Sequence, residues 1–125
     1  PADLKFEHDE GKMAEWCRQI DAATPVPWVV LSAGVDIELF RKQVEIACKN
    51  GASGFLAGRA IWKDGVRIAD ARDRRRWLET QGVGNLKSCI AIAEEHATPW
   101  TKKVGRPLPE LAGVTEGWLG RYAPA

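Results

Sequence analysis

The chain has 125 residues, of which 45% are hydrophobic and 28% charged, a composition typical of one folded domain or part of one rather than of a disordered segment. Its 18 lysines and arginines nearly balance its 17 aspartates and glutamates, and the net charge of +1 gives no overall attraction to nucleic acid or to an anionic membrane. No apolar run reaches the roughly 20 residues that span a membrane, and no signal-peptide pattern is present, so we expect a cytoplasmic protein.

Three cysteines, Cys17, Cys48 and Cys89, fall within helical patterns, and none belongs to a CxxC pair. An odd number of cysteines on apolar helix faces favours reduced thiols packed in the core, with a reactive thiol as the alternative. The first residue is Pro1 rather than methionine, so we expect the chain to be part of a longer protein.

The first expected helix lies in the N-terminal part of the chain. Residues 1–7 show no helical pattern and are expected to be irregular or extended. From about Asp9 to Ala23, apolar residues recur at i, i+3, i+4 and i+7, starting at Met13. This spacing is typical of an amphipathic helix.

A β–α–β unit is predicted next. The continuous apolar run over residues 27–34 predicts a strand covered on both faces, as parallel sheets require. Asp36 is a suitable N-cap for the amphipathic helix that follows, and Asn50-Gly51 supplies the left-handed stop at its end. Residues 54–59 predict a second buried strand, so the two strands should be parallel and joined by a right-handed crossover.

Two short helical segments are expected after the second strand. Residues 60–62 should form a turn of helix that Gly65 stops. A further helix should run over residues 69–80 until Gly82 breaks it. Its arginines alternate with Asp70 and Asp73, which favours a solvated face over a nucleic-acid surface. These arginines are Arg72, Arg74, Arg75 and Arg76.

The last predicted helix covers residues 85–97 and should bury Leu86, Ile90 and Ala93. From Pro99 onward glycine and proline recur, so we expect an irregular tail that is partly docked through Trp100 and Trp118.

The fold class predicted from these elements is α/β. Two parallel strands do not form a stable sheet without neighbours, which this chain does not supply. Residues 1–104 are therefore expected to be the C-terminal portion of a (β/α)8 TIM barrel, namely its last two β–α units plus terminal helices. Residues 105–125 are expected to form the irregular, Gly/Pro-rich tail.

Glycine turns follow both predicted strands and form the main candidate site. Ser32, Ala33 and Gly34 follow the first strand, and Gly58 and Arg59 follow the second. In barrels the loops after the last two strands often bind phosphate, because glycines let backbone N–H groups approach the anion and an arginine adds a bidentate contact. The alternative is that the glycines only permit tight turns and that the arginine makes a surface ion pair.

Other side chains are weaker candidates. His8 and His96 are expected to be solvated or capping groups rather than catalysts. Trp16, Trp28 and Trp77 are expected in the core. Trp62 could border a ligand, but packing is the preferred interpretation.

The two strand–turn segments resemble a known enzyme family. The stretch from Pro27 to Asp36 (PWVVLSAGVD), the pair Leu39-Phe40, and the stretch from Gly51 to Trp62 (GASGFLAGRAIW) closely resemble the tagatose 1,6-bisphosphate aldolase family, to which sulfofructose-phosphate aldolases belong. A looser similarity continues through Trp77-Leu78, Gly82, Asn85-Leu86 and Thr98-Pro99-Trp100-Thr101, so the resemblance covers approximately residues 20–104.

This resemblance implies a (β/α)8 barrel and class I aldol cleavage of a ketose phosphate into dihydroxyacetone phosphate and an aldehyde. It implies no metal and no other cofactor, because a lysine of the family forms a Schiff base with the substrate. It also implies that Ser32, Gly34, Gly58 and Arg59 bind the substrate phosphate. The expected partners are the sugar phosphate and the remainder of the barrel, without nucleic acid or membrane, while assembly into a homo-oligomer stays open.

One part of the family pattern is absent from this chain. The Schiff-base lysine lies in a Lys-Val-Glu-type strand, a few residues before a proline that corresponds to Pro1. Lys5, in Leu4-Lys5-Phe6-Glu7, imitates that motif but is too near Ser32 in sequence. We therefore expect this chain alone to bind phosphate poorly and to catalyse nothing, and the longer protein to be the enzyme.

Two other functions stay open. A different barrel isomerase or synthase could share the phosphate loops alone, and a non-catalytic module could keep this part of the barrel as a scaffold. Within the aldolase family, the sugar and its second headgroup, a phosphate or a sulfonate, also stay open.

Overall fold

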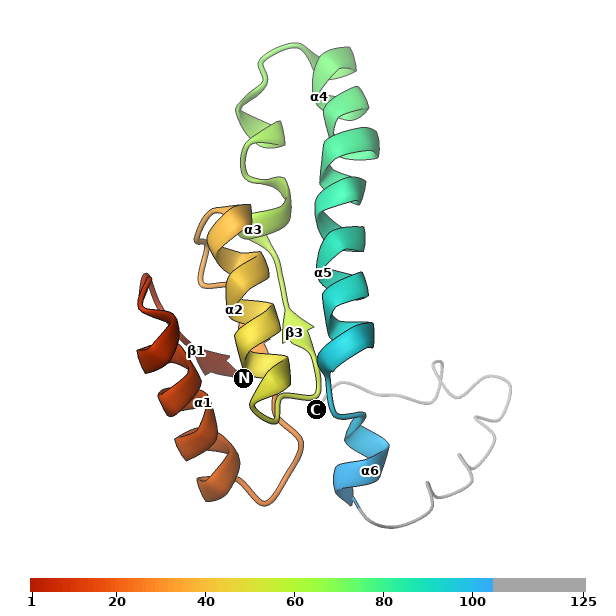
Figure 1. The fold of residues 1–125 in the computed structure, drawn as a ribbon. Helices are drawn as coiled ribbons and strands as arrows, with labels where there is room; N and C mark the ends of the chain where they lie inside the picture. The colour runs from red at the N-terminus through yellow and green to blue at the C-terminus, as the bar shows by residue number, and fades with distance from the viewer. Residues whose placement is uncertain (105–125) are drawn as a thin grey trace, which may run out of the picture.

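The computed structural model describes residues 1–104, which form a small parallel sheet with helices packed along it (Figure 1). The expected α/β class is confirmed for this part of the chain. The predicted tail over residues 105–125, with Trp118, lies outside the described residues.

The sheet has three short parallel strands in the order β1-β2-β3. They are β1 (Ala2–Asp3), β2 (Val30–Leu31) and β3 (Phe55–Leu56). The parallel pairing of β2 with β3 confirms the predicted crossover, although each regular strand is shorter than its apolar run. The prediction of only two strands is wrong, because β1 joins the sheet through its backbone: the N–H of Ala2 donates to the carbonyl of Val29 at 2.8 Å.

The strand side chains form two rows that differ in exposure. One row is Ala2, Val30 and Phe55, and the other is Asp3, Leu31 and Leu56. In the first row Val30 is fully buried, and Phe55 packs edge-on against Phe40 with ring centroids 5.9 Å apart. In the second row Leu56 is 52% exposed. Since successive side chains of a strand point to opposite faces, only one face of the described sheet is covered, and the prediction of two covered faces is wrong here.

Two well-capped helices cover that face. The first is α1 (Glu10–Ala23) and the second is α2 (Ile37–Lys49). They begin at Asp9 and Asp36, whose side chains accept backbone N–H bonds at 3.0 and 2.8 Å. After α2 the chain turns at Gly51 with a left-handed φ of 106°. Both helices and their ends confirm the prediction.

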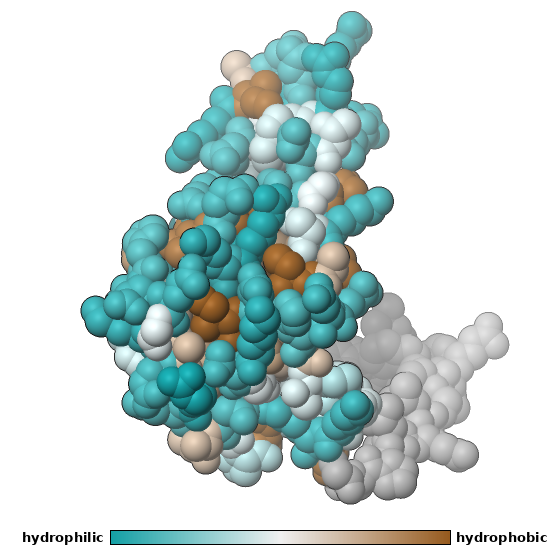
Figure 2. Space-filling model, in the orientation of Figure 1, coloured by the Kyte–Doolittle hydropathy of each residue, from teal (hydrophilic) through white to brown (hydrophobic). Residues whose placement is uncertain are grey.

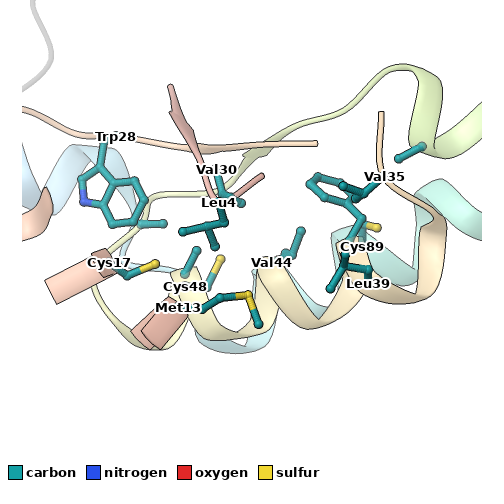
Figure 3. Close-up of a cluster of buried hydrophobic side chains, with 14 residues drawn as sticks. Leu4, Met13, Cys17, Trp28, Val30, Val35, Leu39, Val44, Cys48 and Cys89 are labelled. Atoms are coloured by element: carbon teal, nitrogen blue, oxygen red, sulfur yellow. The ribbon is translucent and has the colours of Figure 1, made fainter. Parts of the chain in front are cut away.

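The core lies between these helices and the strands (Figure 3). Leu4 and Val30 point toward α2, which contributes Val44 and Cys48 from its buried face, while α1 contributes Met13. All five side chains are at most 2% exposed. The polar outer faces of the helices are thereby left to solvent, and the side shown in Figure 2 is mainly hydrophilic with small, separate hydrophobic patches.

All three cysteines are free and buried, as predicted. Burial raises the pKa of Cys17 and of Cys48 to about 11, and it also raises the pKa of Cys89. Because the thiolate is the reactive form, burial disfavours reaction of these thiols, which pack as small apolar core residues.

The chain beyond β3 is almost entirely helical. It contains α3 (Arg59–Trp62), a 3-10 turn (Gly65–Arg67), α4 (Ala71–Trp77), a π-helical segment (Leu78–Gly82), α5 (Val83–His96) and α6 (Trp100–Val104). The helical turn predicted after β3 is confirmed as α3. The prediction that Gly82 breaks the helix is wrong: its φ of −59° and ψ of −47° are helical, and α4 continues into α5 through the π-helical segment (Figure 1).

The buried face of α5 also differs from the prediction. Leu86 and Ile90 are 41% and 39% exposed, whereas Cys89 is fully buried and Ala93 packs against the core as expected. The reason is a polar contact that fixes the rotation of the helix: Nε of Arg41 in α2 donates to Oγ of Ser88 at 2.8 Å. The helix therefore turns Ser88 and Cys89 toward α2.

The tryptophans divide between core and surface. Trp28 is buried and Trp77 is half-buried, but Trp16 is 40% exposed because it lines a hollow beside Leu4 at the β1 edge of the sheet. Trp100 is 49% exposed at the start of α6, so the predicted irregular, docked start of the tail is wrong over residues 100–104.

Asp21 of α1 connects two further parts of the described chain. Its carboxylate forms an ion pair with Lys103 of α6 and accepts a hydrogen bond from Nε1 of Trp28 at 2.9 Å. These two contacts, Lys103 first, hold the pKa of Asp21 below its usual range. No helix among residues 1–104 is long and apolar enough to cross a membrane.

Candidate anion-binding site at the strand ends

The turn after β2 has an unusual backbone conformation. Ala33 and Gly34 both have left-handed φ angles, 49° and 84°, and the N–H of Val35 donates to the carbonyl of Ser32 at 3.1 Å. These features match a type I′ turn, whose two central residues require positive φ. Ser32 is 3% exposed, and its N–H donates to the carbonyl of Leu56 in β3 at 3.1 Å. The serine turn is thus fixed to the neighbouring strand.

Arg59 reaches this turn from the end of β3. A Cβ atom added to Gly34 would lie 3.0 Å from Cζ of Arg59 and 3.2 Å from its Nε and Nη2. The guanidinium group therefore packs directly over the glycine. Since β2 and β3 are parallel neighbours, their carboxyl ends bring Gly34 and Arg59 together, which is the arrangement that the sequence predicts.

Lys63 adds a second cation that sequence reasoning missed. Its Nζ donates to the carbonyl of Gly34 at 3.2 Å. Its backbone N–H donates to the carbonyl of Arg59 at 2.9 Å, so the two cations are four residues apart on one helical turn. This i, i+4 spacing after a predicted helical turn is the signal that could have found it.

Gly58 has a different role from Gly34. It precedes α3, and its carbonyl accepts the N–H of Ile61 at 2.9 Å. Its φ is −139°, and no atom lies within 4 Å of an added Cβ. The geometry therefore shows Gly58 leading Arg59 into α3, and contact with an anion stays a prediction for this residue, as it does for Ser32 and Ala33.

Within the described part of the chain, the α4 arginines and the two histidines make no hydrogen bond or ion pair with Gly34 or with the two cations beside it. The arginines of α4 form exposed ion pairs such as Arg76 with Asp73 at 2.5 Å and Arg75 with Glu79 at 2.9 Å, and that this face does not bind nucleic acid stays a prediction. His8 is exposed, and His96 is the last residue of α5. Among residues 1–104 no group of three or more histidine, cysteine, aspartate or glutamate side chains could hold a metal ion.

Lys5 follows β1 rather than the strands that carry the candidate site. Its side chain is exposed, and its φ of 53° is left-handed. Its backbone is fixed on both sides: the N–H donates to Oδ1 of Asp3 at 2.6 Å, and the carbonyl accepts Nε2 of the buried Gln43 at 2.9 Å.

Comparison with known proteins finds similarity to one family of aldolases. The profile described as DeoC/LacD family aldolase matches residues 5–64, which include both strand ends and α3. The tagatose 1,6-diphosphate aldolase 2 of Streptococcus mutans is 35% identical over 108 residues, covering 82% of this chain and 33% of the relative. The tagatose 1,6-diphosphate aldolase of Listeria monocytogenes is 33% identical over 109 residues, covering 83% and 32%.

Residues 5–64 thus match the DeoC/LacD aldolase family, and the similar curated proteins are tagatose 1,6-diphosphate aldolases. This confirms the resemblance seen in the sequence. The chain spans about a third of the length of these curated relatives, and the matched part contains Gly34, Arg59 and Lys63.

Proposed function

We propose that this chain is the phosphate-binding C-terminal part of a (β/α)8 barrel aldolase that cleaves a ketose phosphate, such as tagatose 1,6-bisphosphate, into dihydroxyacetone phosphate and an aldehyde. The observation that carries the proposal is the Arg59 guanidinium packed over Gly34, where two neighbouring parallel strands end. Backbone amides of a glycine turn and a guanidinium fork together suit a phosphate group.

The uncovered face of the sheet is a second observation in favour of the proposed barrel. Helices cover the row that contains Val30, while Leu56 in the other row is exposed. In a closed barrel this second row would face the interior and pack against layers from the other strands. The relatives are about three times as long as the matched part, which leaves room for those strands.

The catalytic step of the proposal uses a lysine that precedes Pro1 in the longer protein. Its amine condenses with the substrate ketone to an imine and releases water. The imine is protonated to an iminium, and a base takes the proton of the hydroxyl group next to the bond that is cleaved. The carbon–carbon bond then breaks, the aldehyde leaves, and the bonding electrons enter the iminium to give an enamine. Protonation and hydrolysis of the enamine release dihydroxyacetone phosphate. In this scheme Ser32, Ala33, Gly34, Gly58 and Arg59 hold the phosphate and so position the ketone.

Borohydride trapping tests the proposal on the longer protein. Reduction in the presence of dihydroxyacetone phosphate should leave a covalent adduct on a lysine that precedes Pro1, and mass spectrometry locates it. Arg59→Ala should raise KM for the ketose phosphate by about tenfold or more, since it removes a charge-assisted contact of about 1.5–3 kcal/mol. The matched control is Arg75→Ala, because Arg75 is exposed on α4.

The results of borohydride trapping and of the Arg59→Ala kinetics distinguish the aldolase from a different phosphate-binding enzyme. An adduct and a raised KM support the aldolase. The absence of any adduct removes the Schiff-base mechanism and favours a different phosphate-binding barrel enzyme. An unchanged KM in Arg59→Ala removes the proposed phosphate site.

A further inference from the structure

We propose that Lys63 is a second cation of the phosphate site and makes the site select a dianionic headgroup, a phosphate monoester, over a monoanionic one such as a sulfonate. This inference rests on the proposed function, because it concerns the same site. It assigns a specificity-determining role to a residue outside the glycine turns.

Two cations converge on one glycine. The Arg59 guanidinium packs over Gly34, and Nζ of Lys63 donates to the carbonyl of the same residue at 3.2 Å. Both side chains leave the same turn of helix, since Lys63 N–H donates to the carbonyl of Arg59. Like charges four residues apart repel each other, so this arrangement is unfavourable without an anion between or beside them.

The acidic residues near this turn are occupied elsewhere. Asp36 accepts the N–H of Leu39 as the N-cap of α2, and Asp64 pairs with Arg67 at 3.6 Å. Within residues 1–104, every ion pair uses a cation other than Arg59 or Lys63. The described part of the protein therefore supplies two positive charges here without a carboxylate to balance them.

The free donors of these side chains match a phosphate group. A lysine ammonium has three N–H donors, and one of them is used by the Gly34 carbonyl. Two donors remain beside the guanidinium fork. A phosphate monoester carries a charge of about −1.5 to −2 at neutral pH and three acceptor oxygens, whereas a sulfonate carries a single negative charge. A sulfonate has the same number of acceptor oxygens, so the preference comes from charge: two cations attract the dianion more strongly than the monoanion.

The test compares two probes on the longer protein at pH 7.5. Glycerol 1-phosphate represents the dianion and 3-hydroxypropane-1-sulfonate the monoanion, and calorimetry gives the Kd of each. Lys63→Met should weaken binding of glycerol 1-phosphate about tenfold, which corresponds to one charge-assisted hydrogen bond. It should change the Kd of the sulfonate less than about threefold. Lys63→Arg keeps the charge and should restore most of the selectivity.

The controls separate this inference from the proposed function. Lys87→Met, at an exposed position of α5, should change neither Kd. An equal loss for both probes in Lys63→Met would mean that Lys63 only fixes the turn, and an unchanged Kd for glycerol 1-phosphate would mean that it plays no part; either result overturns the inference. If the unmodified protein binds neither probe, or if Arg59→Met binds both normally, the phosphate site itself is wrong.

Discussion

Gly34 has two independent reasons to be glycine. Its φ of 84° lies in the left-handed region, which costs an L-residue about 1–2 kcal/mol. In addition, a Cβ would lie 3.0 Å from Cζ of Arg59, tighter than ordinary van der Waals contact. The first reason concerns the stability of the turn, and the second concerns the position of the guanidinium.

Gly34→Ala should therefore have two separable effects. We expect a loss of about 1–2 kcal/mol in the free energy of unfolding from the backbone strain. We also expect weaker binding of glycerol 1-phosphate to the longer protein, because the new methyl group displaces Arg59. Urea unfolding measures the first effect and calorimetry the second. A variant that loses stability but keeps its Kd would show that the position of the guanidinium over Gly34 is unimportant.

Sequence reasoning at single residues succeeded where backbone geometry dictates the residue type. Gly34 and Arg59 could be paired in advance because parallel strands end at the same edge of a sheet. Lys63 was missed because its i, i+4 spacing from Arg59 is a weak signal, and a lysine after a four-residue helix is usually solvated. Leu86 and Ile90 were misassigned because the Arg41–Ser88 contact, not apolar spacing, sets the rotation of α5.

At the level of elements, the helices with strong caps were predictable and the segments held by tertiary contacts were not. Asp9, Asp36 and Gly51 mark the limits of α1 and α2 in the sequence itself. In contrast, β1 has no apolar alternation and exists through backbone pairing with β2. Gly82 is buried beside Trp77 with helical φ and ψ angles, so a glycine at this position does not end the helix.

Two glycines of the helical segment after β3 should respond in opposite ways to alanine. A Cβ at Gly65 would overlap the ring of Trp77 and lie 3.0 Å from Cδ2 of Leu78, so Gly65→Ala should lower the free energy of unfolding by about 1–3 kcal/mol. Gly84 lies in α5 with open space around its added Cβ, so Gly84→Ala should raise it by about 0.5–1 kcal/mol. Urea unfolding of the 125-residue chain, followed by tryptophan fluorescence, measures both. A stabilising Gly65→Ala would contradict the packing of α4 against the 3-10 turn.

At the level of the whole molecule, the described residues form a sheet that is covered on one side only. The family match from residue 5 to residue 64 lies on the part that carries the strand ends. The sequence predicted missing neighbours because two strands are too few for a sheet, and that stays a prediction. It could not show that β1 joins β2. The barrel itself is the proposal that accounts for both observations.

The 125-residue chain by itself should not cleave tagatose 1,6-bisphosphate. We expect no aldehyde release above background in a coupled assay and no borohydride adduct on Lys5, because the proposed Schiff-base lysine precedes Pro1. The same assay on the longer protein should show cleavage. An adduct on Lys5 in the shorter chain would instead place the reactive amine directly after β1.

Because Leu56 is exposed in the 125-residue chain, substitutions at this position should affect the stability of this chain and of the proposed barrel differently. Because half of the leucine surface is open to water here, replacing it with serine would leave the unfolding curve of the 125-residue piece nearly unaltered. In the proposed barrel Leu56 would face the apolar interior, and the same replacement would put a hydroxyl group and a cavity there. Stability measurements on variants of the 125-residue chain would therefore show little effect at exposed sheet positions such as Leu56, although the proposed barrel would depend on them.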